Sequence, residues 1–197
     1  MSEKYCGVKF KTIFENRCVV DNSGLIELSG WCKEFCKMGF TPKYNGCAGN
    51  LSFRTRNGFI ITSSMADFYN LSVEDFCEVL AVDLDAKAVY VNGVKVPSSE
   101  TIMHSEIYKK RKDINAVFHG HSEDILKYGN RIGIVSTSEE KEAGSIELMR
   151  EVVKVLDNNN FIIIKNHGFL SLGDSMASAG NLAIKRFNQI QRIKRLL

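Results

Sequence analysis

Two short apolar runs separated by Arg56-Asn57-Gly58 are the sequence feature that most restricts the fold of this chain. Asn-Gly supplies the positive φ values that tight hairpin turns require, so residues 50–55 and 59–62 are expected to pair antiparallel. A second pair, 80–84 and 88–91, is expected on similar grounds. Early hairpins of this kind exclude the regular βαβ alternation of a Rossmann fold.

Helices are predicted between and after these hairpins because apolar residues recur at spacings of three and four. Ser98 and Ser99 are expected to cap the second long helix, and residues 122–124 to begin a short one. The helices are expected at 22–39, 100–111, 142–156 and 174–197, and further strands at 115–121, 161–164 and 168–172. With 197 residues, 44% of them hydrophobic, the chain is expected to form a single α/β domain over residues 1–197.

The net charge of +3 and the absence of a basic block argue against nucleic acid as a partner. The N-terminus is polar and no apolar run follows it, so we expect neither a signal peptide nor a membrane span, and a cytoplasmic location. The six cysteines are expected to stay as thiols. Cys32 and Cys36 share an apolar helical stripe, which favours a core role over metal binding.

Histidines in an apolar setting provide the clearest chemical signal. His119-Gly120-His121 places two imidazoles on one face of a predicted strand, since side chains alternate along a strand. His167 follows another apolar strand and precedes Gly168. Three neutral imidazoles with an open position are typical of catalytic zinc sites, whereas structural zinc sites usually have four ligands. The alternative is that these are ordinary core or surface histidines.

Several polar residues near predicted turns extend this pattern. Glu100, at a predicted helix start, can reach the metal as a ligand or general base, or can simply interact with the helix dipole. Asn50, the segment Thr62-Ser63-Ser64, and the pair Ser98 and Ser99 offer amide and hydroxyl groups that could cradle a phosphate. Each of these segments, taken alone, is better explained as an ordinary turn.

Taken in order, these motifs resemble the class II aldolase/adducin family. The likeness covers most of the chain and is carried by Gly49-Asn50-Leu51-Ser52, Ile61-Thr62-Ser63-Ser64, Pro97-Ser98-Ser99-Glu100, Val117-Phe118-His119-Gly120-His121-Ser122 and Asn166-His167-Gly168. It implies a three-layer α/β/α fold around a largely antiparallel sheet, and a homotetramer with active sites between subunits. It also implies zinc ligation by His119, His121, His167 and Glu100, and phosphate binding by Asn50, Thr62, Ser63, Ser64, Ser98 and Ser99.

The function implied by the resemblance is a zinc-dependent aldolase. Such an enzyme cleaves a short ketose 1-phosphate, similar to L-fuculose 1-phosphate, into dihydroxyacetone phosphate and an aldehyde through a metal-stabilised enediolate that Glu100 protonates. Mn2+ or Co2+ could replace zinc in an imidazole site. Alternatives within the family are a methylthioribulose-1-phosphate dehydratase and a ribulose-phosphate 4-epimerase. Family epimerases carry Asp in the slot of Glu100, so the glutamate favours aldolase or dehydratase.

A non-enzymatic, adducin-like structural module is a further alternative, but a scaffold has no physical need for a chelating face.

Two departures from the family concern the substrate. The phosphate turn reads Thr62-Ser63-Ser64-Met65, without the usual Pro and Gly, and residues 136–144 contain no tyrosine to protonate the leaving group. The leaving-group acid is therefore unassigned. His104, four residues after Glu100, is expected to support the site or pack beside it, not to bind metal.

Overall fold

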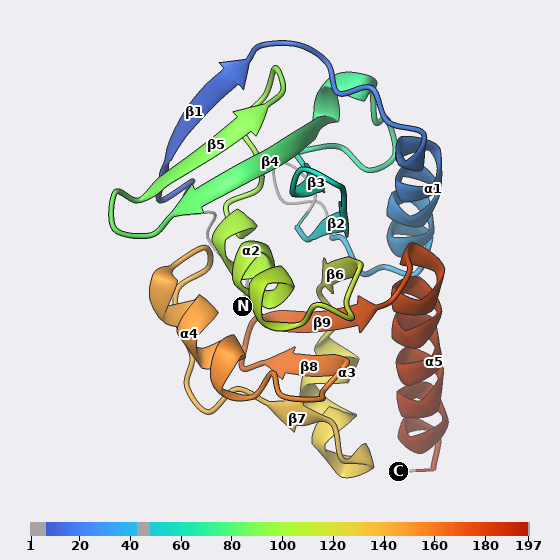
Figure 1. Ribbon diagram of the computed structural model, residues 1–197. Helices are drawn as coiled ribbons and strands as arrows, with labels where there is room; N and C mark the ends of the chain where they lie inside the picture. The colour runs from blue at the N-terminus through green and yellow to red at the C-terminus, as the bar shows by residue number, and fades with distance from the viewer. Residues whose placement is uncertain (1–6, 43–47, 197) are drawn as a thin grey trace.

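The computed structural model describes residues 7–42 and 48–196, and within this part nine strands form one mixed sheet (Figure 1). Its strand order is β1-β5-β4-β3-β2-β6-β9-β8-β7. The strands are β1 (Lys11–Asn16), β2 (Asn50–Arg54), β3 (Phe59–Thr62), β4 (Phe76–Asp83), β5 (Ala88–Asn92), β6 (Ala116–Gly120), β7 (Val135–Ser136), β8 (Phe161–Ile164) and β9 (Gly168–Gly173). The pairs β1·β5 and β7·β8, at the two edges of the sheet, are parallel, and the pairs between them are antiparallel.

Helices cover both faces of the sheet (Figure 1). They are α1 (Gly24–Lys37), α2 (Thr101–Lys110), α3 (Glu123–Tyr128), α4 (Ile146–Lys154) and α5 (Met176–Lys194), with 3-10 turns η1 (Val73–Asp75) and η2 (Gly129–Ile132). Figure 1 shows α2 and α4 on one side of the sheet, and α1 and α5 together on the other. Each side has its own apolar core: Phe118 packs with α1, α3 and α5, and Val117 with α2 and α4. The predicted α/β class is confirmed, with a mixed sheet.

The predicted hairpins formed as expected. Ser52 pairs with Ile61 across the turn at Asn57-Gly58, and Val82 with Val89 across the next hairpin. Gly58 has a φ of +159° and its Cα lies so close to the carbonyl of Val79 that an added Cβ would overlap the oxygen. Only glycine fits there, because its neighbour strand passes directly over it.

Several predicted boundaries were wrong. Strands β1 and β7 were not predicted, β4 begins at Phe76 instead of residue 80, and β6 ends at Gly120, before His121. The helix-capping prediction was also wrong, because α2 begins at Thr101 and its N-cap is Glu100. α4 begins at Ile146, where Ser145 accepts a hydrogen bond from the amide of Leu148 and so fixes the helix start.

Other predictions agree with the structure or fall outside it. Leu25, Leu28, Cys32, Phe35 and Cys36 are buried along one stripe of α1, as predicted. Cys6 and Cys47, two of the cysteines expected to stay as thiols, fall outside the described residues, as does Leu197 at the end of the predicted final helix. Among the described helices, none is long and apolar enough to cross a bilayer.

Candidate metal centre

Three central strands meet at one end of the sheet and bring the predicted histidines together. Strand β6 runs antiparallel to both β2 and β9, so the end of β6 lies beside the starts of its two neighbours. In this register Asn50 lies opposite His119, and Gly120 lies opposite Phe169. His167 belongs to the turn that joins β8 to β9 and therefore enters the same end.

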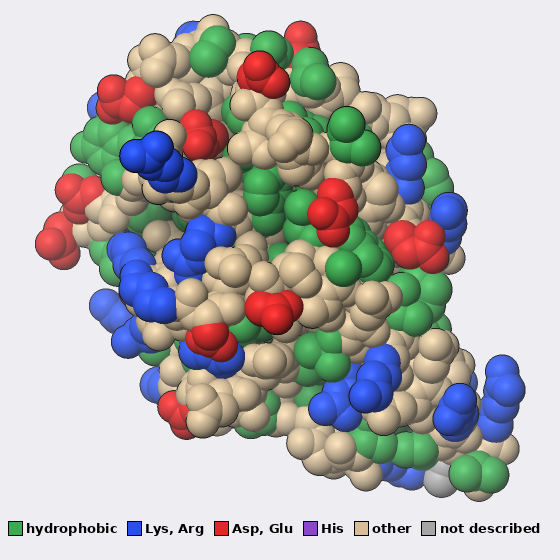
Figure 2. Space-filling model, turned by 45° about the vertical axis from the view of Figure 1, so that its right-hand side comes forward, with side chains coloured by type: hydrophobic (Ala, Val, Ile, Leu, Met, Phe, Trp, Pro, Cys, Tyr) green, Lys and Arg blue, Asp and Glu red, His purple; other side chains and the backbone are tan. Residues whose placement is uncertain are grey.

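The Nε2 atoms of the three histidines converge. Nε2 of His119 lies 3.0 Å from Nε2 of His121 and 3.1 Å from Nε2 of His167. A tetrahedral zinc ion with Zn–N bonds of about 2.0–2.1 Å holds its ligand nitrogens about 3.3 Å apart, so the spacing fits a shared cation. His119 and His167 are buried, and no histidine is visible on the face shown in Figure 2.

The orientation of His119 is set by the backbone of the neighbouring strand. Its Nδ1 lies 2.9 Å from the carbonyl oxygen of Phe169. A carbonyl can only accept, so Nδ1 carries the proton and Nε2 presents a lone pair to the cluster, as in metal-binding histidines generally. For His121, burial and then the neighbouring rings of His119 and His167 keep the pKa well below its usual value, because both disfavour an added charge. A neutral imidazole is the form that binds metal.

Glu100 closes the other side of the histidine cluster. Its Oε2 lies 3.2 Å from Nε2 of His119, and its Oε1 lies 3.3 Å from Nε2 of His167. Although Glu100 is the N-cap of α2, its side chain makes no capping hydrogen bond. Of the two roles considered from the sequence, the geometry therefore favours the metal-facing one. Burial alone raises the pKa of this carboxyl, but His119, His167 and Asn50 together hold it well below its usual range.

The glycines beside the histidines are required by space. A Cβ on Gly168 would lie 2.5 Å from the carbonyl oxygen of Gly120 and 2.8 Å from Cε1 of His119. A Cβ on Gly120 would lie 2.8 Å from the ring of Phe169. All three contacts are closer than real Cβ atoms show, so larger residues would separate β6 from β9 and displace His119.

The segments predicted to bind phosphate lie next to each other at this end of the molecule. Ser63 forms a β-bridge with Pro97, and the amide of Ser98 donates to the carbonyl of Thr62 at 3.1 Å. The hydroxyl of Thr62 accepts from the amide of Leu51, and that of Ser63 donates to Asp75. Phosphate binding by Thr62, Ser63, Ser64, Ser98 and Ser99 stays a prediction, since several of these hydroxyls already serve the scaffold.

Asn50 has a contact that the sequence did not suggest. Its Nδ2 donates to Oε2 of Glu100 at 2.8 Å, and both side chains are buried. Asn50 therefore contacts the carboxylate of the centre directly. No sequence signal indicates this pairing, because the two residues are 50 positions apart and belong to different elements.

His104 is buried and lies outside the ligand cluster. Its Nδ1 is 2.7 Å from the hydroxyl of Ser52, which is also 2.8 Å from the hydroxyl of Tyr108. Burial lowers the pKa of His104 to about 3, so the ring is neutral at physiological pH. This agrees with the predicted supporting or packing role.

The loop around residue 140 borders the centre without supplying a tyrosine. Asn166, next to His167, donates to the Glu140 carboxylate at 2.7 Å. A Cβ on Gly144 would lie 2.8 Å from the carbonyl oxygen of Ser99, so this loop also packs against the residue that precedes Glu100. The loop thus touches the neighbours of two predicted ligands.

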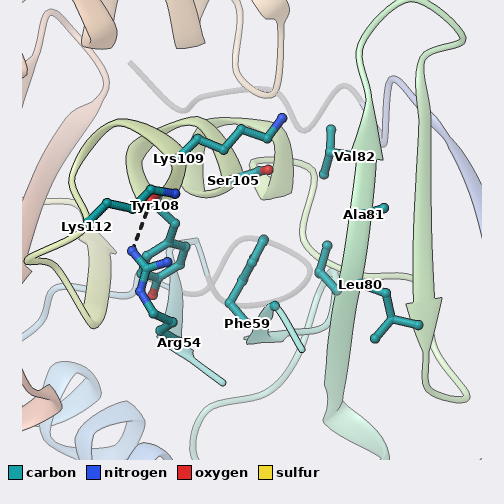
Figure 3. Close-up of a pocket in the computed structure, with 11 residues that line it drawn as sticks. Arg54, Phe59, Leu80, Ala81, Val82, Ser105, Tyr108, Lys109 and Lys112 are labelled. Carbon is teal, nitrogen blue, oxygen red and sulfur yellow. Dashed lines mark hydrogen bonds between the residues drawn. The ribbon is translucent and has the colours of Figure 1, made fainter. Parts of the chain in front are cut away.

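A hollow of about 160 Å³ lies between α2 and β4, away from the histidine cluster, and none of the predicted site residues lines it (Figure 3). Arg54 is one of the charged residues that line it, and its guanidinium donates hydrogen bonds to the carbonyls of Tyr108, Arg111 and Ile114. A guanidinium bound to carbonyls at a helix C-terminus is a cap that answers the helix dipole. The charge of Arg54 is thereby accounted for structurally.

Comparison with known proteins gives a consistent result. Residues 27–186 match the family model described as "Class II Aldolase and Adducin N-terminal domain". An L-fuculose phosphate aldolase of Methanocaldococcus jannaschii is 31% identical over 161 residues, which span 74% of this chain and 84% of that protein. A 5-methylthioribulose-1-phosphate/5-deoxyribulose-1-phosphate aldolase of Rhodospirillum rubrum is 28% identical over 160 residues, which span 71% of this chain and 67% of that protein.

The fold is also found among solved structures. An L-fuculose 1-phosphate aldolase aligns with a TM-score of 0.73 and 24% identity, over 90% of this chain and 87% of the other. A sugar-phosphate aldolase from Thermotoga maritima aligns with a TM-score of 0.70 and 18% identity, over 86% of this chain and 94% of the other. At this identity the two structures support the fold.

Proposed function

The chain belongs to the class II aldolase and adducin family, and from this premise we propose that it is a zinc-dependent aldolase acting on a short ketose 1-phosphate. The products would be dihydroxyacetone phosphate and an aldehyde. The observation that carries the proposal is the convergence of the Nε2 atoms of His119, His121 and His167 on one point beside the Glu100 carboxylate.

The prediction of an enzyme, a carbon–carbon lyase of the aldolase type, is confirmed by the relatives, which carry aldolase names. An adducin-like scaffold would have no use for a buried carboxylate beside the histidine cluster, because burying a charge is costly even where it is paired. The ligand cluster therefore supports catalysis over a purely structural role.

The ligand set also suggests how the work is divided. A divalent cation held by the three imidazoles would supply Lewis-acid polarisation of a substrate carbonyl. Glu100 is the buried carboxylate within reach of the same point, so it is suited to hold and deliver a proton at the reacting carbon. The backbone carbonyl of Phe169 keeps Nε2 of His119 aimed at the point where the three imidazoles converge, where they would hold the cation. His104 is not suited to act as the acid, because its ring is buried and forms a hydrogen bond with Ser52.

The substrate proposal rests on the names of two kinds of relative. The Methanocaldococcus jannaschii protein is named for L-fuculose phosphate, and the Rhodospirillum rubrum protein for 5-methylthioribulose and 5-deoxyribulose 1-phosphates. A ketose 1-phosphate is common to these names. We propose that Asn50, Thr62, Ser63, Ser64, Ser98 and Ser99 bind its phosphate, because their segments adjoin the Glu100 end of α2. Dehydration of a methylthioribulose-type phosphate and 4-epimerisation remain the alternative reactions.

Other features of the proposal come from the family resemblance or, for the single domain and the location, from length, composition and the polar N-terminus. We propose a homotetramer, a single domain over residues 1–197, a largely antiparallel three-layer arrangement and a cytoplasmic location. Zn2+ is the proposed cation, with Mn2+ and Co2+ as substitutes, since imidazole sites accept several divalent metals.

A substrate screen tests the function. Purified protein loaded with Zn2+, Mn2+ or Co2+ is offered L-fuculose 1-phosphate, 5-deoxyribulose 1-phosphate, 5-methylthioribulose 1-phosphate and ribulose 5-phosphate. We expect release of dihydroxyacetone phosphate from at least one ketose 1-phosphate, metal-dependent and lost in Glu100→Gln. A dehydrated or epimerised product without dihydroxyacetone phosphate would replace the aldolase proposal with the corresponding alternative.

A further inference from the structure

We infer that Asn50 is a positioning residue that holds the Glu100 carboxylate against the metal ligands. Its Nδ2 donates to Oε2 of Glu100 at 2.8 Å, and that same oxygen lies 3.2 Å from Nε2 of His119. The amide therefore contacts the carboxylate oxygen that faces the ligand cluster. Family resemblance assigns Asn50 only to phosphate, which makes this a second role.

The backbone fixes the position of Asn50 beside the centre. Asn50 opens β2 and lies directly opposite His119 in the β2·β6 pair, near the middle of the sheet. Gly49, with a φ of +104°, precedes it, and a Cβ there would lie 2.8 Å from the carbonyl oxygen of His119. Glycine thus permits the close approach of the two strands that sets the side chain of Asn50 beside the centre.

The unpartnered atom of Asn50 argues against phosphate as its sole ligand. Within the described part of the chain, Oδ1 of Asn50 is buried and has no hydrogen-bond partner. An amide oxygen repels a phosphate oxygen, so a phosphate could use only the second hydrogen of Nδ2. The first hydrogen would still hold Glu100. Hydrogen bonds to a carboxylate are the stronger kind, and buried ones are costly to lose.

The consequence is that the carboxylate is aimed before substrate arrives. Oε1 reaches His167 and Oε2 reaches His119, which is one specific orientation of the carboxylate plane. Without the amide, Glu100 keeps its charge but loses the group that fixes this plane. Residues that orient ligands in this way typically change metal affinity or activity by about 10–100-fold when replaced.

The test uses the full chain loaded with Co2+, whose visible absorption reports the number and arrangement of its ligands. We expect Asn50→Ala and the similarly shaped Asn50→Leu, neither of which can donate a hydrogen bond to Glu100, to change the Co2+ spectrum and to weaken Co2+ binding by about 10–100-fold. In the aldolase assay, kcat should fall by a similar factor. Asn115→Ala, which removes a side-chain amide hydrogen bond to the backbone carbonyl of Asp174, outside the ligand cluster, should leave the spectrum unchanged.

A double-mutant cycle separates positioning from a general structural effect. If Asn50 acts through Glu100, Asn50→Ala should change neither the spectrum nor the affinity further in a Glu100→Gln background. An Asn50→Ala protein with wild-type Co2+ spectrum and affinity, and only a raised KM for phosphorylated substrates, would overturn the inference. Additive effects in the cycle would do the same.

The inference rests on the proposed function only for the kinetic measurement. Co2+ binding and absorption need no substrate, so a failed substrate screen with a positive spectral result would leave the role of Asn50 intact. A positive screen with an unchanged spectrum would reject that role and keep the aldolase.

Discussion

His119 and Phe169 are joined by a 2.9 Å hydrogen bond from the imidazole Nδ1 to the backbone carbonyl oxygen, across the β6·β9 pair. The bond decides which ring nitrogen faces His121 and His167. Because the acceptor is a main-chain atom, the orientation depends on strand register and not on the identity of residue 169. The ligand geometry is therefore secured by the sheet itself.

Removing one imidazole should remove the metal. In His121→Ala two histidines remain, and we expect the affinity for Zn2+ or Co2+ to fall by more than the roughly 100-fold typical of outer-shell changes. Metal content after dialysis, measured by elemental analysis, checks this. His104→Gln is the matched control, because His104 is buried nearby but lies outside the cluster, and it should keep the wild-type metal content. Metal retained by His121→Ala would contradict the assigned ligand set.

Gly168→Ala should destabilise the protein and disturb the centre together. The added Cβ would press on Gly120 and the His119 ring at 2.5 and 2.8 Å, and overpacking of this kind costs about 1–3 kcal/mol. Chemical denaturation gives the free energy of unfolding, and Co2+ titration gives the effect on the ligands.

Gly30→Ala is the control for this substitution. Gly30 lies within α1 with open space where its Cβ would be, so alanine should stabilise the helix by about 0.5–1 kcal/mol. A Gly168→Ala protein as stable as wild type would show that β6 and β9 can separate without cost.

The parts of the fold with a local cause could be predicted from the sequence. The β2·β3 hairpin could be predicted because its turn requires a glycine, which Gly58 supplies at a φ of +159°, although Asn57 does not adopt the positive φ that the motif suggested. The apolar stripe of α1 follows from helical periodicity. Strand β1 could not be predicted in this way. Its residues are mostly half-buried or exposed, and it becomes a strand by pairing with β5, far away in the sequence. β7, of two residues, has no pattern to detect.

In the candidate site, too, some features could be predicted from the sequence and others could not. The histidines and Glu100 were predicted because metal chemistry restricts which residue types can serve. The bond between Asn50 and Glu100, and the link from His104 to Ser52 and Tyr108, were not, since they depend on tertiary register. Residue type indicates what chemistry a site can do, whereas the sheet decides which atoms meet.

Met65→Gly should not destabilise the protein. Met65 has a φ of +60°, in the left-handed region that glycine adopts most readily, and its side chain is half exposed. Relief of backbone strain, about 1–2 kcal/mol, should at least offset the greater chain entropy of unfolded glycine and the small loss of buried surface. Thermal denaturation checks this. Met38→Gly, at the C-cap of α1 with ordinary φ of −75°, is the control and should lose stability.

His104 should make the protein less stable as the pH falls below about 6.5. In the folded protein burial lowers the pKa of His104 to about 3, whereas the unfolded chain has the ordinary value of 6.5. Between these pH values His104 is protonated in the unfolded state and neutral in the folded state. The stabilisation from neutral His104 is therefore fully present above about pH 6.5 and is lost progressively toward pH 3.

The matched comparison is His104→Gln, which cannot titrate. Between pH 7 and pH 5 the wild type should lose about 2 kcal/mol more unfolding free energy than the variant, from the linkage relation. Urea denaturation of both metal-loaded proteins at these two pH values measures the difference, and the other histidines contribute equally to both. Parallel losses in the two proteins would mean that His104 accepts a proton in the native state, which its burial against Ser52 and Tyr108 opposes.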